Sequence, residues 1–302
     1  MTRTSGEPLS AVGARVRRIR VSAGDLALSG LLGEPEGAPP RAVVVALHGA
    51  GMSAEYFHGK AHQDVSLAAL GTLLGFTVLA LDRPGYGASA AGAPHGRTLD
   101  EQAAAVHAAL AWFADRHPVG AGFFLLGHSY GGKVALTAAA QPAGADLLGV
   151  DVSGCGQEYA VPDDLLDDRR SEHWTKNWGA LRCYPPSTFT LSKSLVSPVP
   201  KQERAEARRW PGQFAQVAAA VRTPVRFTFA EHESWWRHDE TAVGDLRARF
   251  TSSPRVLVER QPDSGHNISL GWSARSYHLR ALGFLEECLA SDARRREHPL
   301  HP

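Results

Sequence analysis

A Gly-x-Ser-x-Gly turn between a strand pattern and a helix pattern constrains this chain most. Residues 127–131 read Gly-His-Ser-Tyr-Gly. They follow the apolar run 122–126, typical of a short buried strand, and precede residues 133–140, which are good helix formers. The flanking glycines suit a turn too sharp for side chains at those positions. The pattern predicts that Ser129 projects above a sheet, at a helix N-terminus that favours negative charge.

By itself, such a pentapeptide also fits a glycine-rich turn with a solvated serine, so its context matters. Residues 41–47 are apolar and β-branched without a helical period, which predicts a central parallel strand that ends at residues 48–51, His-Gly-Ala-Gly. A second such run, residues 76–81, leads into residues 82–89, which read Asp-Arg-Pro-Gly-Tyr-Gly-Ala-Ser. These segments place two further turns at strand ends.

Together these segments resemble the α/β-hydrolase family. The serine pentapeptide resembles its nucleophile elbow, the His-Gly turn resembles the one after its third strand, and residues 82–89 resemble its Asp-x-x-Gly-x-Gly-x-Ser loop. The resemblance implies that Ser129 is the nucleophile and that the backbone amides of Ala50 and Tyr130 bind the oxyanion. It implies a structural role for Asp82 in shaping the pocket wall.

The family places its triad in the chain order serine, acid, histidine. His266 follows the strand pattern of residues 255–259, in a loop over residues 262–267. An imidazole titrates near neutrality, so it can take the serine proton and return it to a leaving group. Of the fourteen histidines, His266 combines a Gly-His pair with this location, and we predict it to be the general base.

The acid has three candidates. The strand pattern of residues 223–229 continues into Ala-Glu-His-Glu, where relatives usually read Gly-x-x-Asp. Aligning Ala230 with that glycine places Glu233 at the acid, with alanine for glycine and glutamate for aspartate as departures from the family pattern. Glu233 ranks first and Glu231 second. Asp151 is the third, because some relatives place the acid after the sixth strand.

The alternating patterns predict an α/β fold, a mostly parallel eight-stranded sheet flanked by helices, with an antiparallel hairpin at about residues 16–32. The alternation breaks down after the sixth strand, where residues 157–209 are polar, broken by prolines and rich in bulky aromatics. The resemblance implies a small cap at this place. We therefore expect a core of residues 1–156 and 210–302 and a cap of a few helices over residues 157–209.

Four tryptophans are candidates for the substrate pocket. Trp174 and Trp178 belong to the expected cap, and Trp235 and Trp236 lie beside the acid loop. Aromatic walls suit a hydrophobic or ring-bearing substrate. The same rings could instead bury the cap against the core, because they cover large areas in either role.

Composition excludes several other classes of protein. A net charge of +1 gives no support for a nucleic-acid partner. Residues 67–81 are uncharged but too short to span a bilayer, and the start of the chain lacks the apolar core of a signal peptide, so we expect no membrane partner and a cytoplasmic location. Three cysteines have no disulfide or metal-site spacing, and His58 and His62, which lie four positions apart and could face one way, have no further ligand cluster. We expect neither a metal nor a cofactor, and no sequence feature specifies an oligomeric state.

The resemblance implies a serine hydrolase that cleaves a carboxylic ester of a small hydrophobic or ring-containing substrate through an acyl-enzyme. Esters are favoured over amides because an alkoxide leaving group needs less help from the acid. Alternatives are a thioesterase, a carbon–carbon bond hydrolase, and a lyase that eliminates a carboxylate, such as acetate from an acetylated natural-product intermediate of a GC-rich bacterium. A ligand-binding receptor on the same scaffold is the non-enzyme alternative.

Overall fold

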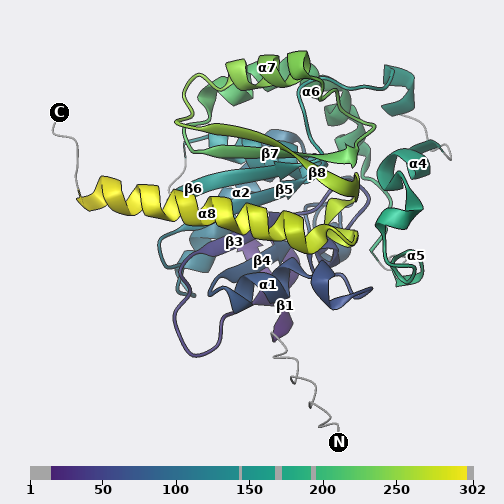
Figure 1. Cartoon of the computed structure of the whole chain (residues 1–302). Helices are drawn as coiled ribbons and strands as arrows, with labels where there is room; N and C mark the ends of the chain where they lie inside the picture. The colour runs from purple at the N-terminus through teal and green to yellow at the C-terminus, as the bar shows by residue number, and fades with distance from the viewer. Residues whose placement is uncertain (1–14, 143–144, 167–171, 192–194, 298–302) are drawn as a thin grey trace, which may run out of the picture.

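One eight-stranded sheet runs through the protein (Figure 1). The computed structural model describes residues 15–142, 145–166, 172–191 and 195–297. The strand order is β1-β2-β4-β3-β5-β6-β7-β8. Strand β2 is antiparallel to both of its neighbours, β1 and β4, and all the other neighbouring strands are parallel. The strands are β1 (Val16–Ala23), β2 (Leu26–Gly33), β3 (Val43–Leu47), β4 (Thr77–Leu81), β5 (Phe123–His128), β6 (Leu147–Ser153), β7 (Val225–His232) and β8 (Val256–Gly265). This confirms the predicted fold class and its N-terminal hairpin.

Helices cover both faces of the sheet. They are α1 (Leu67–Leu73), α2 (Leu99–Ala114), α3 (Tyr130–Ala140), α4 (Glu172–Trp178), α5 (Thr188–Leu191), α6 (Lys201–Ala220), α7 (Glu240–Arg249) and α8 (Ala274–Glu297). Helices α1 and α8 pack on one face, and α2, α3, α6 and α7 on the other (Figure 1). Every residue of β3, β4 and β5 is therefore buried, which explains why these strands read as unbroken apolar runs.

Helix α6 runs unbroken through the predicted boundary between cap and core at residue 209. It does so although Pro211 lies inside it and lacks the N–H that would bond the carbonyl of Ala207. The hydroxyl of Tyr159 donates to that carbonyl at 3.0 Å and so replaces the missing donor. Trp210, on the same helix, is fully buried in the core. The segment after β6 thus shares a helix with the layer that covers the sheet.

The parallel strands end at one edge of the sheet, so the loops that follow them meet there. The loops after β3, β7 and β8 carry Ala50, Glu233 and His266, and Ser129 follows β5. Among the described residues, no helix is both long and apolar enough to cross a membrane.

Candidate active site

Ser129 occupies a strained turn between β5 and α3. Its backbone has φ of 53° and ψ of −116°, a region that costs a non-glycine residue about 1–3 kcal/mol. A Cβ on Gly127 would lie 2.5 Å from the carbonyl oxygen of Gly131, and one on Gly131 would lie 2.0 Å from that of Leu47. Both flanking glycines are therefore required by close backbone approach, as the pentapeptide predicted.

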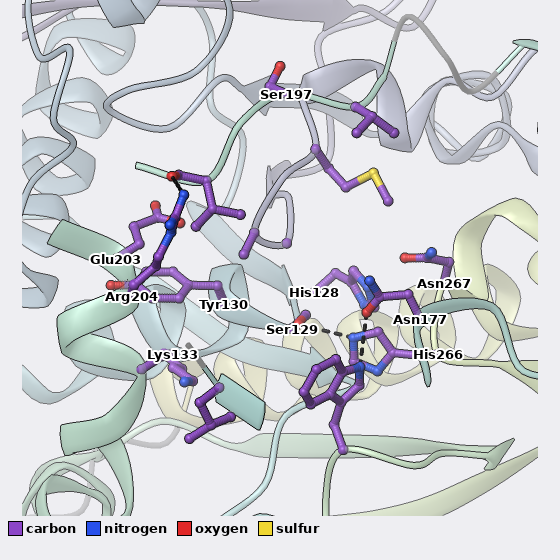
Figure 2. A pocket seen from close by; sticks show the side chains of 18 of the residues that line it. His128, Ser129, Tyr130, Lys133, Asn177, Ser197, Glu203, Arg204, His266 and Asn267 are labelled. Carbon is purple, nitrogen blue, oxygen red and sulfur yellow. Dashed lines mark hydrogen bonds between the residues drawn. The ribbon is translucent and has the colours of Figure 1, made fainter. Parts of the chain in front are cut away.

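The structure brings Ser129, His266 and Glu233 into one hydrogen-bonded chain (Figure 2 shows its Ser129 to His266 link). The Nε2 atom of His266 lies 3.1 Å from Ser129 Oγ, and its Nδ1 atom lies 2.8 Å from one carboxylate oxygen of Glu233 and 3.1 Å from the other. An ionised carboxylate only accepts hydrogen bonds, so Nδ1 carries the proton and Nε2 is left to accept the serine hydroxyl. This arrangement matches what a general base needs.

Glu233 is held as a carboxylate in a buried place. Burial acts to raise its pKa, but the charge of His266, the hydrogen bond from His266 and the amide of Trp235 together lower it below the ordinary value. The amides of Ser234 and Trp235 donate to its Oε1 atom at 3.0 and 2.9 Å. The side chain is thus fixed by the turn that follows β7 and is ready to hold the imidazole in one tautomer.

The two other candidate acids form hydrogen bonds with groups other than His266. Glu231 accepts the amide of Asp263 at 2.7 Å and so supports the loop that leads to His266. Asp151 is fully buried and accepts hydrogen bonds from Tyr277, at 2.7 Å, and from Arg226. Neither carboxylate forms a hydrogen bond with His266.

We expect Asp151→Asn to lower the free energy of unfolding by about 3 kcal/mol, because it leaves the buried Arg226 guanidinium without its closest charge partner. Urea unfolding followed by tryptophan fluorescence measures this loss, and kcat of the folded protein should stay at the wild-type level. A loss of kcat by orders of magnitude with unchanged stability would instead make Asp151 the acid.

The backbone amides of Ala50 and Tyr130 are the predicted oxyanion donors. Ala50 and Tyr130 both line the cavity that contains Ser129. Tyr130 is the first residue of α3, so its amide has no intrahelical acceptor. Neither amide donates a hydrogen bond to another residue within the described parts of the chain. Asp82, the expected scaffold carboxylate, accepts from the amide of Ala54 at 2.8 Å and from the Ser29 hydroxyl at 2.6 Å.

A buried network that the sequence did not reveal ties α6 to the loop that carries Ala50. Arg83 and Glu203 form an ion pair and are 1% and 0% exposed. Tyr86 donates to Glu203 at 2.7 Å, and its hydroxyl oxygen accepts the amide of Gly51 at 3.0 Å. Arg83 and Tyr86 occupy variable positions of the loop at residues 82–89, and Glu203 lies 120 and 117 positions after them. Only the structure could therefore show that α6 supports the turn that carries Ala50.

The site opens into a cavity of about 650 Å³ (Figure 2). The core contributes Ser129, His266 and the side chains of Trp235 and Trp236 to its lining. The segment after β6 contributes the opposite wall. Residues of that segment on the wall are Tyr159, Leu166, Asn177, Val196, Ser197, Pro198, Val199, Glu203, Arg204 and Ala207. Among the described residues, no three histidine, cysteine or carboxylate side chains form a group that could hold a metal ion.

The expectation that Trp174 and Trp178 line the pocket needs correction. Trp235 and Trp236 do line the cavity, but the other two tryptophans are not among its described lining residues. Trp178 is buried with its ring 5.2 Å from that of Trp174 and 5.2 Å from that of Phe189. The Trp178 ring is buried in this aromatic cluster, and Trp174 packs on it with about half of its own surface exposed. This is the packing role that large aromatic side chains also serve.

Lys133, which the sequence pattern places only in a run of good helix formers, lines the cavity. It lies on the cavity wall with Glu203 and Arg204. A signal was available in its spacing, because a residue four positions after Ser129 on a helix shares the face that Ser129 begins.

Comparison with known proteins agrees with this geometry. A sequence model described as the alpha/beta hydrolase family matches residues 44–278, most of the chain. The chain belongs to the α/β-hydrolase family. This α/β hydrolase is therefore an enzyme, and the matched stretch includes Ser129, Glu233 and His266. No curated protein sequence matches the chain.

Solved structures share the α/β-hydrolase fold at low identity. A thermostable carboxyl esterase from Bacillus coagulans is 16% identical with a TM-score of 0.67, over 91% of this chain and 99% of that one. An esterase from Pyrococcus furiosus is 16% identical with a TM-score of 0.64, over 95% of each chain. A proline iminopeptidase from Mycobacterium smegmatis is 19% identical with a TM-score of 0.59, over 91% of this chain and 100% of that one. These similarities show the fold.

Proposed function

We propose that this enzyme hydrolyses a carboxylic ester of a small, hydrophobic or ring-containing substrate through an acyl-enzyme. The observation that carries the proposal is the continuous hydrogen-bonded chain from Ser129 through His266 to Glu233, with Ser129 opening into the cavity. Esterases among the structural neighbours support the choice of substrate class. Trp235 and Trp236 support an apolar or ring-bearing group beside the serine.

In the proposed acylation step, His266 Nε2 takes the hydroxyl proton as Ser129 Oγ attacks the ester carbonyl carbon. The negative charge that forms on the carbonyl oxygen is stabilised by the amides of Ala50 and Tyr130, each worth several kcal/mol of barrier, roughly 3–4. Glu233 stabilises the imidazolium without itself taking a proton. The imidazolium then protonates the leaving alcohol, and the acyl group stays on Ser129.

Deacylation repeats these roles with water. His266 removes a proton from water as the water oxygen attacks the acyl carbon, and the proton passes to Ser129 Oγ when the acid leaves. The released acid therefore carries one oxygen atom from solvent. That oxygen separates hydrolysis from an elimination, which would leave a new double bond in the substrate and place no solvent oxygen in the acid.

A panel of 4-nitrophenyl esters with aliphatic and aryl acyl groups tests the proposal. We expect repeated turnover, and mass spectrometry in H₂¹⁸O should find one ¹⁸O atom in each released acid. Turnover without the label, together with an unsaturated product from acetylated substrates, would favour the lyase alternative. Stoichiometric binding without any turnover would favour the receptor alternative.

We further propose that the substrate is a small molecule met in the cytoplasm. The thiols of Cys155 and Cys183 are buried and form no disulfide, which fits a reducing compartment. The cap role of residues 157–209 is also a proposal, supported by the contribution of this segment to the cavity wall.

A further inference from the structure

Lys133 places an ammonium group inside the cavity. It lies on α3 one turn after Ser129, lines the cavity, and is only 2% exposed. In Figure 2 its side chain lies on the side of Ser129 away from His266. One α-helical turn rises about 6 Å over four residues, so an ester held at Ser129 could extend to this group within a few bonds.

The direction of the hydrogen bond between Lys133 and Tyr159 follows from the position of Pro211 on α6. Because Pro211 has no N–H, the carbonyl of Ala207 is free to accept the Tyr159 hydroxyl proton, at 3.0 Å. The Tyr159 oxygen must then accept from Lys133, whose Nζ atom lies 2.6 Å away. This hydrogen bond uses one of the three protons of the ammonium group.

The remaining protons of Lys133 have no carboxylate partner among the described residues. Four aromatic rings surround Nζ at 5.1 to 5.7 Å, those of Tyr130, Tyr159, Trp210 and Trp236. Their faces attract a cation but accept no full hydrogen bond. Burial lowers the pKa of Lys133 to about 8, so the side chain is still mostly charged at pH 7. A buried ammonium group whose protons lack acceptors destabilises the protein, unless a ligand supplies the missing acceptors.

The other charged residues of the cavity wall also favour a negatively charged ligand. Arg204, on α6, also lines the cavity, and in the structure its guanidinium donates to the carbonyl of Val199 at 3.0 Å without a salt bridge to any described carboxylate. Glu203 is the lining residue of opposite charge, but its carboxylate is committed to Arg83 and Tyr86. The wall therefore presents uncompensated positive charge.

We propose that the substrate carries a carboxylate in addition to its scissile ester, and that Lys133 binds this carboxylate. The inference rests on the proposed function, because it places the ester carbonyl at Ser129. The carboxylate could belong to the acyl part or to the alcohol part. In either case the two free protons of Lys133 gain an acceptor, and the ester is oriented along the cavity wall.

The test compares kcat/KM for two charged esters, each with a neutral partner that has a similar leaving group. 4-Nitrophenyl hydrogen adipate carries the carboxylate on the acyl side and is compared with 4-nitrophenyl hexanoate. The hexanoate ester of 4-hydroxybenzoate carries it on the alcohol side and is compared with the hexanoate ester of methyl 4-hydroxybenzoate. We expect one charged ester to be favoured over its neutral partner by roughly tenfold or more, the size of one charge-assisted hydrogen bond. Lys133→Met should reduce that ratio to about one, since the cation is gone. The exposed Lys201→Met is the matched control and should keep the wild-type ratio.

A second variant, Tyr159→Phe, tests the inference if Lys133→Met does not fold. Tyr159→Phe keeps the cation but removes the acceptor that orients it, and should lower the ratio in the same direction. No preference for either charged ester, or a preference that survives Lys133→Met, would overturn the inference while hexanoate turnover leaves the proposed function standing. If no ester reacts, adipate binding by calorimetry decides: weaker binding to Lys133→Met supports the inference, and equal or absent binding overturns it.

Discussion

Replacing Glu233 by glutamine is expected to lower kcat for ester hydrolysis by about 10⁴-fold, with little change in the fold. The amide keeps the size of the side chain but can donate to Nδ1 of His266, which would favour the tautomer that presents a proton to Ser129. That tautomer cannot accept the serine proton. Stopped-flow or steady-state release of 4-nitrophenol measures the loss, and circular dichroism checks the fold.

Glu231→Gln is the matched control for this prediction. Glu231 lies two residues earlier, and its carboxylate accepts the amide of Asp263 rather than a proton of the imidazole. We expect kcat to fall by at most about tenfold, the effect of one ordinary hydrogen bond that positions the loop. The assignment of the acid would be wrong if Glu231→Gln abolished activity and Glu233→Gln retained it.

Replacing Ser129 by alanine is expected to reduce kcat by about 10⁶-fold, because no nucleophile remains for acylation. The residual rate would come from the oxyanion amides and from substrate binding. Alanine removes only the hydroxyl, so the substrate should still bind with a similar Kd, measurable by fluorescence titration of the cavity tryptophans.

Ser197→Ala serves as the control, since Ser197 lines the same cavity from the opposite wall and forms no hydrogen bond with His266. Its kcat should change by at most about tenfold. Retention of full activity by Ser129→Ala would exclude the acyl-enzyme route, whatever the outcome at Ser197.

The parts of the site that the sequence predicted are those fixed by local backbone geometry. Gly127 and Gly131 are required where a Cβ would lie 2.5 and 2.0 Å from a backbone carbonyl oxygen, so the pentapeptide signals the turn directly. The buried parallel strands read as apolar runs because helices cover both faces. Glu233 followed from its offset along β7, even though glutamate replaces the usual aspartate.

The parts that could not be predicted depend on side chains far apart in the sequence. The pair Arg83 and Glu203 joins segments 120 positions apart, and no periodicity encodes it. Trp174 and Trp178 have the aromatic side chains expected of a pocket wall, yet their rings pack on each other in the structure. The predicted cap boundary at residue 209 falls inside α6, because the Tyr159 hydroxyl compensates for the N–H that Pro211 lacks and the helix continues.

The most direct test of the central claim is intact-mass analysis after treatment with a fluorophosphonate that reacts with activated serines. Our account predicts one adduct per wild-type chain, mapped to the peptide that contains Ser129, and none in Ser129→Ala. His266→Ala should react far more slowly, because the hydroxyl loses the base that lies 3.1 Å from it. An unmodified wild-type protein, or an adduct that persists in Ser129→Ala, would contradict the claim that Ser129 is the activated nucleophile.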